Sequence, residues 1–178
     1  MNQTHVIGKT GLHLPPLSFG GSGLGDMPDT YGYAVSEERA RQTIRAILAL
    51  PDGFIDTSRI YGMGRSEARI GQVVRELGGW PRGCILSTKL DRDMTTGRVD
   101  AARARRSLEE SLKALGVDHV QILHLHDPEH GADLTEVTRK GGALDELLRM
   151  KEEGLADAVG LAAGVVEVML PKIGRAHV

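Results

Sequence analysis

The stretch FIDTSRIYGMGRSE, residues 54–67, holds one strand, one turn and the start of one helix. FIDTS is a short apolar run that ends in polar side chains, which predicts a buried strand. Glycines follow in the turn, and Ser66 is expected to open a helix that runs to Leu77. The same order of strand, turn and helix continues on both sides of this stretch, although no literal repeat is visible.

Three further strands are predicted downstream, at residues 83–89 (GCILSTK), 118–126 (DHVQILHLH) and 155–164 (LADAVGLAAG). Helices are predicted between them, one capped by Asp100 and stopped by Gly116, the other ending at Gly154.

The sequence before residue 54 predicts a hairpin, a third extended piece and a helix. The hairpin turns near Gly8 and Gly11, and the extended piece ends in glycines near residue 20. Ser36 can cap the helix, whose apolar residues Ala40, Ile44, Ile47 and Leu48 recur at helical spacing.

This alternation indicates an α/β fold with parallel strands, because a helix-length connection returns the chain to the same end of a sheet. Both a doubly wound sheet and a β/α barrel fit this alternation. Each predicted strand carries its polar residues at its C-terminal end, where both folds bind ligands: Asp56 and Ser58, Ser87 and Lys89, and His124 and His126. A barrel needs about 250 residues and eight strand–helix units. Only about five strands are predicted in these 178 residues.

The amino-acid composition limits the classes of binding partner that we expect. The chain is 40% hydrophobic and 26% charged, with a net charge of −2 and 3% aromatic residues. This leaves neither the basic surface nor the stacking rings that nucleic acid requires. No signal peptide or membrane span is apparent, and Cys84 is the single cysteine. We therefore expect a cytoplasmic protein with a small-molecule substrate and no nucleic-acid or membrane partner.

The glycine-rich segment GGSGLG, residues 20–25, resembles a phosphate-binding loop but fails both common patterns. Asp26 and Met27 stand where the Walker motif needs Lys and Ser or Thr, and Pro28 stands where a dinucleotide motif needs its third glycine. We interpret the segment as a flexible loop that lets the backbone approach a ligand.

One candidate functional site is a metal site on the strand predicted at residues 118–126. His124 and His126 lie two residues apart and so share a face, with Asp127 and His130 nearby. A metal-dependent hydrolase is the corresponding function. We favour an interpretation without metal, because short His/Asp patterns often occur by chance and a neighbouring strand contributes a lysine instead of another ligand.

Asp56, Tyr61, Lys89 and His126 form a more specific combination. A tyrosine hydroxyl has a pKa of about 10 and is a weak acid at neutral pH. A nearby ammonium such as Lys89 is expected to lower that pKa, and a carboxylate such as Asp56 keeps the ammonium charged. An imidazole can hydrogen-bond the substrate oxygen. Each residue alone has an ordinary alternative role: a turn cap, rim packing, a surface charge or a polar core residue.

The segments FIDTSRIYG, ILSTKL and DHVQILHLHDP resemble, in this order, the signatures of the aldo-keto reductases, from about Leu12 to Gly164. The resemblance implies a (β/α)8 TIM barrel closed at its base by the N-terminal hairpin, an NAD(P)H cofactor and hydride transfer to a carbonyl or from an alcohol or aldose. The implied catalytic residues are Asp56, Tyr61, Lys89 and His126. His126 is preferred over His124 because it stands two residues before a proline. Gly21, Ser22 and Asp56 are implied to bind the cofactor, and Arg59 is interpreted as a solvated rim charge.

The sequence resembles the aldose and pyridoxal dehydrogenase branch of the family more than the steroid-reducing branch. Ala162 and Ala163 stand where many members have a Ser-Asn pair that holds the nicotinamide amide. Some relatives are regulatory subunits, so a non-catalytic role is a second alternative. We expect residues 1–178 to form one partial barrel domain that is inactive alone. Residues 172–178 look like an artefactual tail, although a natural short tail is the alternative.

Overall fold

The computed structural model describes residues 4–131 and 134–173. Its strands are β1 (His5–Val6), β2 (His13–Leu14), β3 (Phe19–Gly20), β4 (Phe54–Asp56), β5 (Ile85–Leu90), β6 (Val120–His126) and β7 (Ala156–Ala162). Its α-helices are α1 (Pro28–Tyr31), α2 (Glu37–Leu48), α3 (Arg65–Glu76), α4 (Ala101–Leu115), α5 (Leu134–Thr138), α6 (Ala143–Glu152) and α7 (Val166–Ile173). Two 3-10 helices are η1 (Gly23–Gly25) and η2 (Pro128–His130). None of the helices in the described ranges has the length and hydropathy needed to cross a membrane.

The strands form two sheets. β1 and β2 pair as an antiparallel hairpin, while β3, β4, β5, β6 and β7 follow one another as neighbours in a parallel sheet. The predicted hairpin and five parallel strands are therefore confirmed. Gly8 and Gly11 have φ angles of +48° and +75° in the hairpin turn, a conformation that glycine adopts without steric strain. Within the described residues, β3 and β7 are the edges of the parallel sheet.

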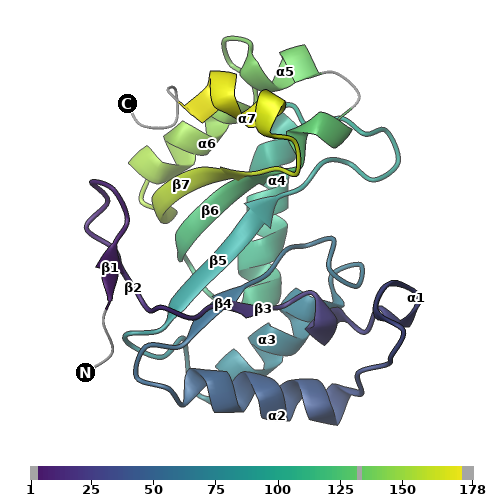
Figure 1. The fold of residues 1–178 in the computed structure, drawn as a ribbon, viewed down its shortest axis with the longest axis vertical. Coiled ribbons are helices and arrows are strands. Elements are labelled where there is room, and N and C mark those ends of the chain that lie inside the picture. Colours follow the sequence, from purple (N-terminus) through teal and green to yellow (C-terminus); the bar gives the residue numbers. More distant parts are fainter. Residues whose placement is uncertain (1–3, 132–133, 174–178) are drawn as a thin grey trace.

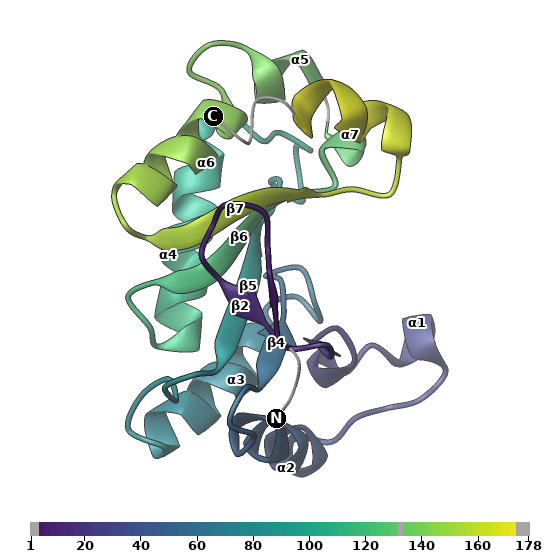
Figure 2. The ribbon, with the colours of Figure 1, turned by 60° about the vertical axis from the view of Figure 1, so that its left-hand side comes forward.

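Helices α2, α3, α4 and α6 cover one face of this sheet, as Figure 1 and Figure 2 show from two directions. Ile55, Leu86, Leu123 and Leu125 are buried and belong to one apolar core with the inner sides of these helices. The four apolar residues predicted to face inward on α2 are all buried there. Fully burying one such side chain contributes roughly 1.5–3 kcal/mol to folding.

Two of the predicted helix starts are confirmed by their caps. The Ser36 hydroxyl accepts a hydrogen bond from the amide of Arg39 at 3.2 Å, and the Asp100 carboxylate accepts one from the amide of Arg103 at 2.8 Å. The start predicted at Ser66 was wrong by one residue, because α3 begins at Arg65. Ser66 is buried, and its hydroxyl donates to the carbonyl oxygen of Gly21 at 2.7 Å, so it joins the first parallel strand to α3.

Helix α5 was not predicted, and neither was α7. Residues 172 and 173 of the expected artefactual tail are the last two residues of α7, while residues 174–178 lie outside the described residues.

Candidate active site

Asp56 and Lys89 form the centre of the site. Asp56 is the last residue of β4, and Lys89 lies near the end of β5, the next strand in the sheet. The Lys89 Nζ atom donates to Asp56 Oδ2 and to the carbonyl oxygen of Thr57, both at 2.7 Å. Lys89 is only 5% exposed, so the alternative of a surface charge was wrong. A buried ammonium needs such partners, because an unpaired charge in the interior is strongly destabilising.

Tyr61 lies in the turn after β4, directly over Lys89. The Lys89 Nζ atom is 4.8 Å from the centre of the tyrosine ring. The turn is held by the glycine-rich loop: a Cβ added at Gly25 would lie 2.8 Å from the amide nitrogen of Gly62, so only glycine permits this approach. The backbone of the glycine-rich loop therefore packs against the turn that carries Tyr61.

The pKa of Tyr61 is raised, whereas the sequence analysis predicted that it would be lowered. Burial of the phenol is the largest effect and raises the pKa above the usual 10.0, while the charge of Lys89 lowers it but does not outweigh burial. The carboxylates of Asp56 and Asp91 add to the increase. The predicted lowering by Lys89 is present, but the predicted net direction was wrong, because the depth of the ring could not be inferred from its neighbours in sequence. At neutral pH the side chain is a neutral phenol.

His126 ends β6 and faces Tyr61. The two ring centres are 6.0 Å apart, and the ring planes cross at 85°. The Nδ1 atom of His126 lies 2.5 Å from Asp91 Oδ1, and the Ser58 hydroxyl donates to Asp91 Oδ2 at 2.8 Å. Asp91 was missed by the sequence analysis. It follows the end of β5 and so met the criterion of a polar residue at a strand end that had selected the other residues.

His124 lies deeper on the same strand and has other partners. Its Nδ1 atom is 3.2 Å from the hydroxyl of Ser87, which donates to Asp56 Oδ1 at 2.8 Å. Burial lowers the pKa of His124 from 6.5 to about 4. Within residues 4–131 and 134–173, no group of three His, Cys, Asp or Glu side chains could hold a metal ion. His130 is exposed in η2.

Gly21 and Ser22, the predicted cofactor-binding residues, follow β3 beside the end of β4. The Gly21 amide donates to the carbonyl oxygen of Asp56 at 2.7 Å. A Cβ at Gly21 would lie 3.0 Å from that oxygen and 3.1 Å from the Ser66 hydroxyl, which leaves little room for a side chain. The Ser22 hydroxyl accepts a hydrogen bond from the Tyr31 hydroxyl at 2.7 Å.

Ala162 and Ala163 follow at the end of β7, where the sequence lacks the Ser-Asn pair. The next residues are held from the β6 side, because Glu129 Oε1 accepts hydrogen bonds from the amides of Gly164 at 2.5 Å and Val165 at 3.2 Å. No side chain at positions 162 and 163 can donate or accept a hydrogen bond.

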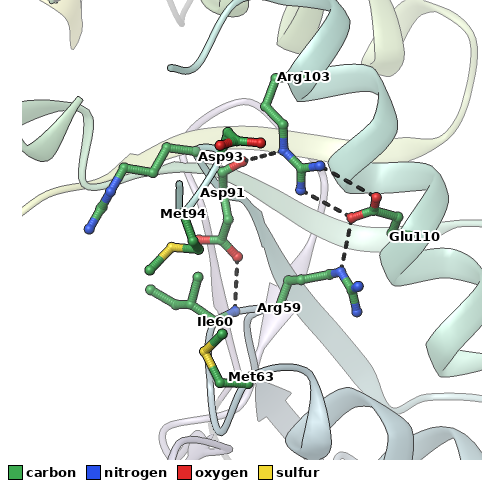
Figure 3. Close-up of a pocket in the computed structure, with 9 residues that line it drawn as sticks. Arg59, Ile60, Met63, Asp91, Asp93, Met94, Arg103 and Glu110 are labelled. Atoms are coloured by element: carbon green, nitrogen blue, oxygen red, sulfur yellow. Dashed lines mark hydrogen bonds and ion pairs between the residues drawn. The ribbon is translucent and has the colours of Figure 1, made fainter. Parts of the chain in front are cut away.

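A cavity of about 270 Å³ lies between the turn after β4, the loop after β5 and helix α4. Figure 3 shows Arg59 and Arg103 pointing toward the shared carboxylate of Glu110 in this cavity. Arg59 Nε and Arg103 Nη2 each lie 3.0 Å from Glu110 Oε2. The hydrogen bond from Arg103 is the main cause that lowers the pKa of Glu110. Arg59 therefore belongs to an ion-pair network, and its side chain is also 37% exposed, which agrees with its interpretation as a solvated rim charge.

A sequence model described as the Aldo/keto reductase family matches residues 16–171. L-galactose dehydrogenase of Arabidopsis thaliana is 33% identical to the chain over 173 residues, which are 97% of this chain and 52% of that protein. The chain therefore spans about half the length of this relative.

Solved structures agree with the fold. A putative aldo-keto reductase from Pseudomonas aeruginosa is 31% identical, with a TM-score of 0.75 over 97% of this chain and 64% of that chain. An aldo-keto reductase from Klebsiella pneumoniae, solved in complex with NADPH, has a TM-score of 0.68 at 21% identity, over 98% of this chain and 54% of that chain. The second of these comparisons supports the fold alone.

Proposed function

The chain belongs to the aldo/keto reductase family, and from this premise we propose that it is the part of an NAD(P)-dependent oxidoreductase that carries the proton-transfer residues. The proposed reaction moves a hydride between the nicotinamide cofactor and an aldehyde, a ketone or an aldose. The observation that supports it most is the cluster of Asp56, Lys89, Tyr61 and His126 at adjacent strand ends.

Tyr61 is the proposed proton donor. Burial keeps it a phenol, which is the form that gives a proton to a developing alkoxide. Lys89 lies against its ring and favours the phenolate that remains after transfer. Asp56 holds the ammonium of Lys89 in place. Together these residues allow the same tyrosine to act as base when the reaction runs toward the carbonyl.

His126 is proposed to bind the reacting oxygen of the substrate. Its ring faces that of Tyr61 edge to face. Because Nδ1 lies against Asp91, the substrate would meet Nε2. With Nδ1–H directed at Asp91, Nε2 can donate to the oxygen only when the ring carries its second hydrogen, and this doubly protonated imidazole would orient the oxygen and stabilise charge that develops on it.

The proposed place of the nicotinamide cofactor is beside the end of β3. Gly21 approaches β4 where a side chain would not fit, and Ser22 and Asp56 add polar groups. We propose that these three residues bind the end of the cofactor that carries the reactive ring. The cofactor supplies the hydride when it is bound. The backbone at Ala162 and Ala163 would have to replace the missing side-chain contacts to its amide.

The substrate is proposed to be a small carbonyl compound or a sugar, because the relative from Arabidopsis thaliana is named for L-galactose. The expected compartment is the cytoplasm, which the free and buried thiol of Cys84 permits.

Tyr61→Phe tests this function in a full-length protein, by which we mean this chain extended to the eight strand–helix units of a complete barrel. The variant keeps the ring over Lys89 but loses the hydroxyl, so we expect unchanged NAD(P)H affinity and a decrease in turnover of about 10²-fold or more. Tyr33→Phe is the matched control, because Tyr33 is 57% exposed and has no proposed role. Fluorescence of the bound cofactor measures affinity, and absorbance at its reduced-form band measures turnover.

Near-normal turnover of the Tyr61→Phe variant would remove Tyr61 from the mechanism. An unsubstituted protein that binds NAD(P)H but turns over no aldehyde or aldose would instead favour the non-catalytic, regulatory alternative. Stoichiometric zinc in the purified protein would favour the hydrolase alternative.

A further inference from the structure

Asp91 is a buried carboxylate outside the four residues proposed to transfer the proton and bind the substrate. It is 2% exposed, and both of its carboxylate oxygens are in use. Oδ1 lies 2.5 Å from the Nδ1 atom of His126, while Oδ2 accepts hydrogen bonds from the Ser58 hydroxyl at 2.8 Å and from the Ile60 amide at 3.2 Å. Figure 3 shows the Asp91 side chain directed at Ile60 in the turn after β4.

These contacts determine which nitrogen of His126 carries a hydrogen. An ionised carboxylate can only accept hydrogen bonds, so the hydrogen between Asp91 and His126 belongs to Nδ1. Ser58 has one hydroxyl hydrogen, which goes to Asp91. Its oxygen, 3.3 Å from Nδ1, can therefore only accept from the imidazole. The ring is held with Nδ1 protonated, and Nε2 alone is available to a substrate.

The other polar neighbours of His126 do not change this assignment. Asp127 Oδ2 lies 3.7 Å from Nε2, which is too long for a hydrogen bond. Tyr61 faces the imidazole with an edge-to-face ring contact.

We propose that Asp91 is a positioning residue for the reaction: with Ser58 and the Ile60 amide, it fixes the orientation and the tautomer of His126, so that Nε2 faces the substrate. The catalytic consequence rests on the function proposed above for His126. The tautomer itself is a property of the folded protein, so it can be measured without substrate or cofactor.

Asp91→Asn should reverse the tautomer. The backbone amide of Ile60 is a fixed donor that cannot turn its hydrogen away, so the carboxamide oxygen of the new side chain should take the place of Oδ2. Its NH2 group then faces Nδ1 of His126, which must become the acceptor. The hydrogen of the neutral ring moves to Nε2. In the opposite orientation of the carboxamide, its NH2 group would face the Ile60 amide, donor against donor, and that amide would keep only its 3.3 Å contact with the Ser58 hydroxyl.

The experiment uses the full-length protein labelled with ¹⁵N-histidine, at a pH where the imidazole of His126 is neutral. A His126→Gln variant assigns the signal, and imidazole ¹⁵N shifts identify the protonated nitrogen. We expect Nδ1–H in the unsubstituted protein and in Ser58→Ala, which keeps the Asp91 acceptor, and Nε2–H in Asp91→Asn. Turnover of Asp91→Asn should fall about tenfold, because a neutral Nε2–H donor replaces the charged donor of a doubly protonated ring, with unchanged NAD(P)H affinity.

An Nε2–H ring in the unsubstituted protein would overturn the proposal, even if Asp91→Asn failed to fold. So would an Nδ1–H ring in a folded Asp91→Asn variant, or a reversed tautomer with normal turnover. If the unsubstituted protein showed no NAD(P)H-dependent turnover, the proposed function would fail, while the ¹⁵N shifts would still decide how Asp91 orients the ring.

Discussion

Protonation of one partly buried imidazole, that of His124, should make the protein less stable in mild acid. Burial lowers the pKa of His124 from 6.5 to about 4, with a smaller decrease from Lys89 and an opposing increase from Asp56. In the unfolded chain the same imidazole binds a proton below pH 6.5. The stability that the neutral ring contributes is therefore present above pH 6.5 and is lost as the pH falls toward 4. Linkage gives a decrease of about 2 kcal/mol in the free energy of unfolding between pH 7.5 and pH 5, and about 3 kcal/mol in full.

Urea unfolding of the full-length protein and of His124→Gln, at pH 7.5 and pH 5.0, measures this contribution. Glutamine keeps a polar group near the Ser87 hydroxyl and does not titrate. The other histidines are present in both proteins, so their effects cancel in the comparison. We expect the free energy of unfolding to fall between the two pH values by about 2 kcal/mol more in the unsubstituted protein than in the variant. Equal decreases, with unchanged denaturant slopes, would show that His124 is already solvated or charged in the folded state.

Two further predictions concern Lys89 and the chain as a whole. Lys89→Met should lower turnover about 10²-fold, because the cation that lowers the pKa of Tyr61 is lost. It should also lower the free energy of unfolding by about 1–3 kcal/mol, because the buried Thr57 carbonyl loses its donor; a stable, active variant would contradict both expectations. The 178-residue chain alone should be poorly soluble and inactive, since β3 and β7 are unpaired edges within the described residues and such edges promote aggregation. Compared with a version of eight strand–helix units, a soluble, cooperatively unfolding and active 178-residue monomer would refute this.

Much of the fold could be predicted because each signal is local. The caps at Ser36 and Asp100 depend on hydrogen bonds within one helical turn, and the hairpin depends on two glycines with positive φ. Helix α5 was missed because its five residues are too short for a helical period to appear. The start of α3 was misplaced because the Ser66 hydroxyl bonds to Gly21, which is 45 positions away.

The candidate site could be assembled from sequence for a topological reason. Parallel strands bring their carboxyl ends to one edge of the sheet, so Asp56, Lys89 and His126 were expected to meet. Two features could not be predicted in this way. The pKa of Tyr61 depends on how deeply the ring is buried, and the role of Asp91 depends on its contact with a histidine 35 positions later.

The choice between the two histidines of β6 follows from which carboxylate each imidazole reaches. His126 touches Asp91 directly and stands at the strand end opposite Tyr61. His124 reaches Asp56 only through Ser87, whose one hydrogen goes to the carboxylate, so its imidazole meets a neutral hydroxyl, and burial lowers its pKa enough to keep it uncharged at neutral pH. The strand therefore presents one imidazole suited to bind a substrate oxygen and one that fills the polar interior beneath it.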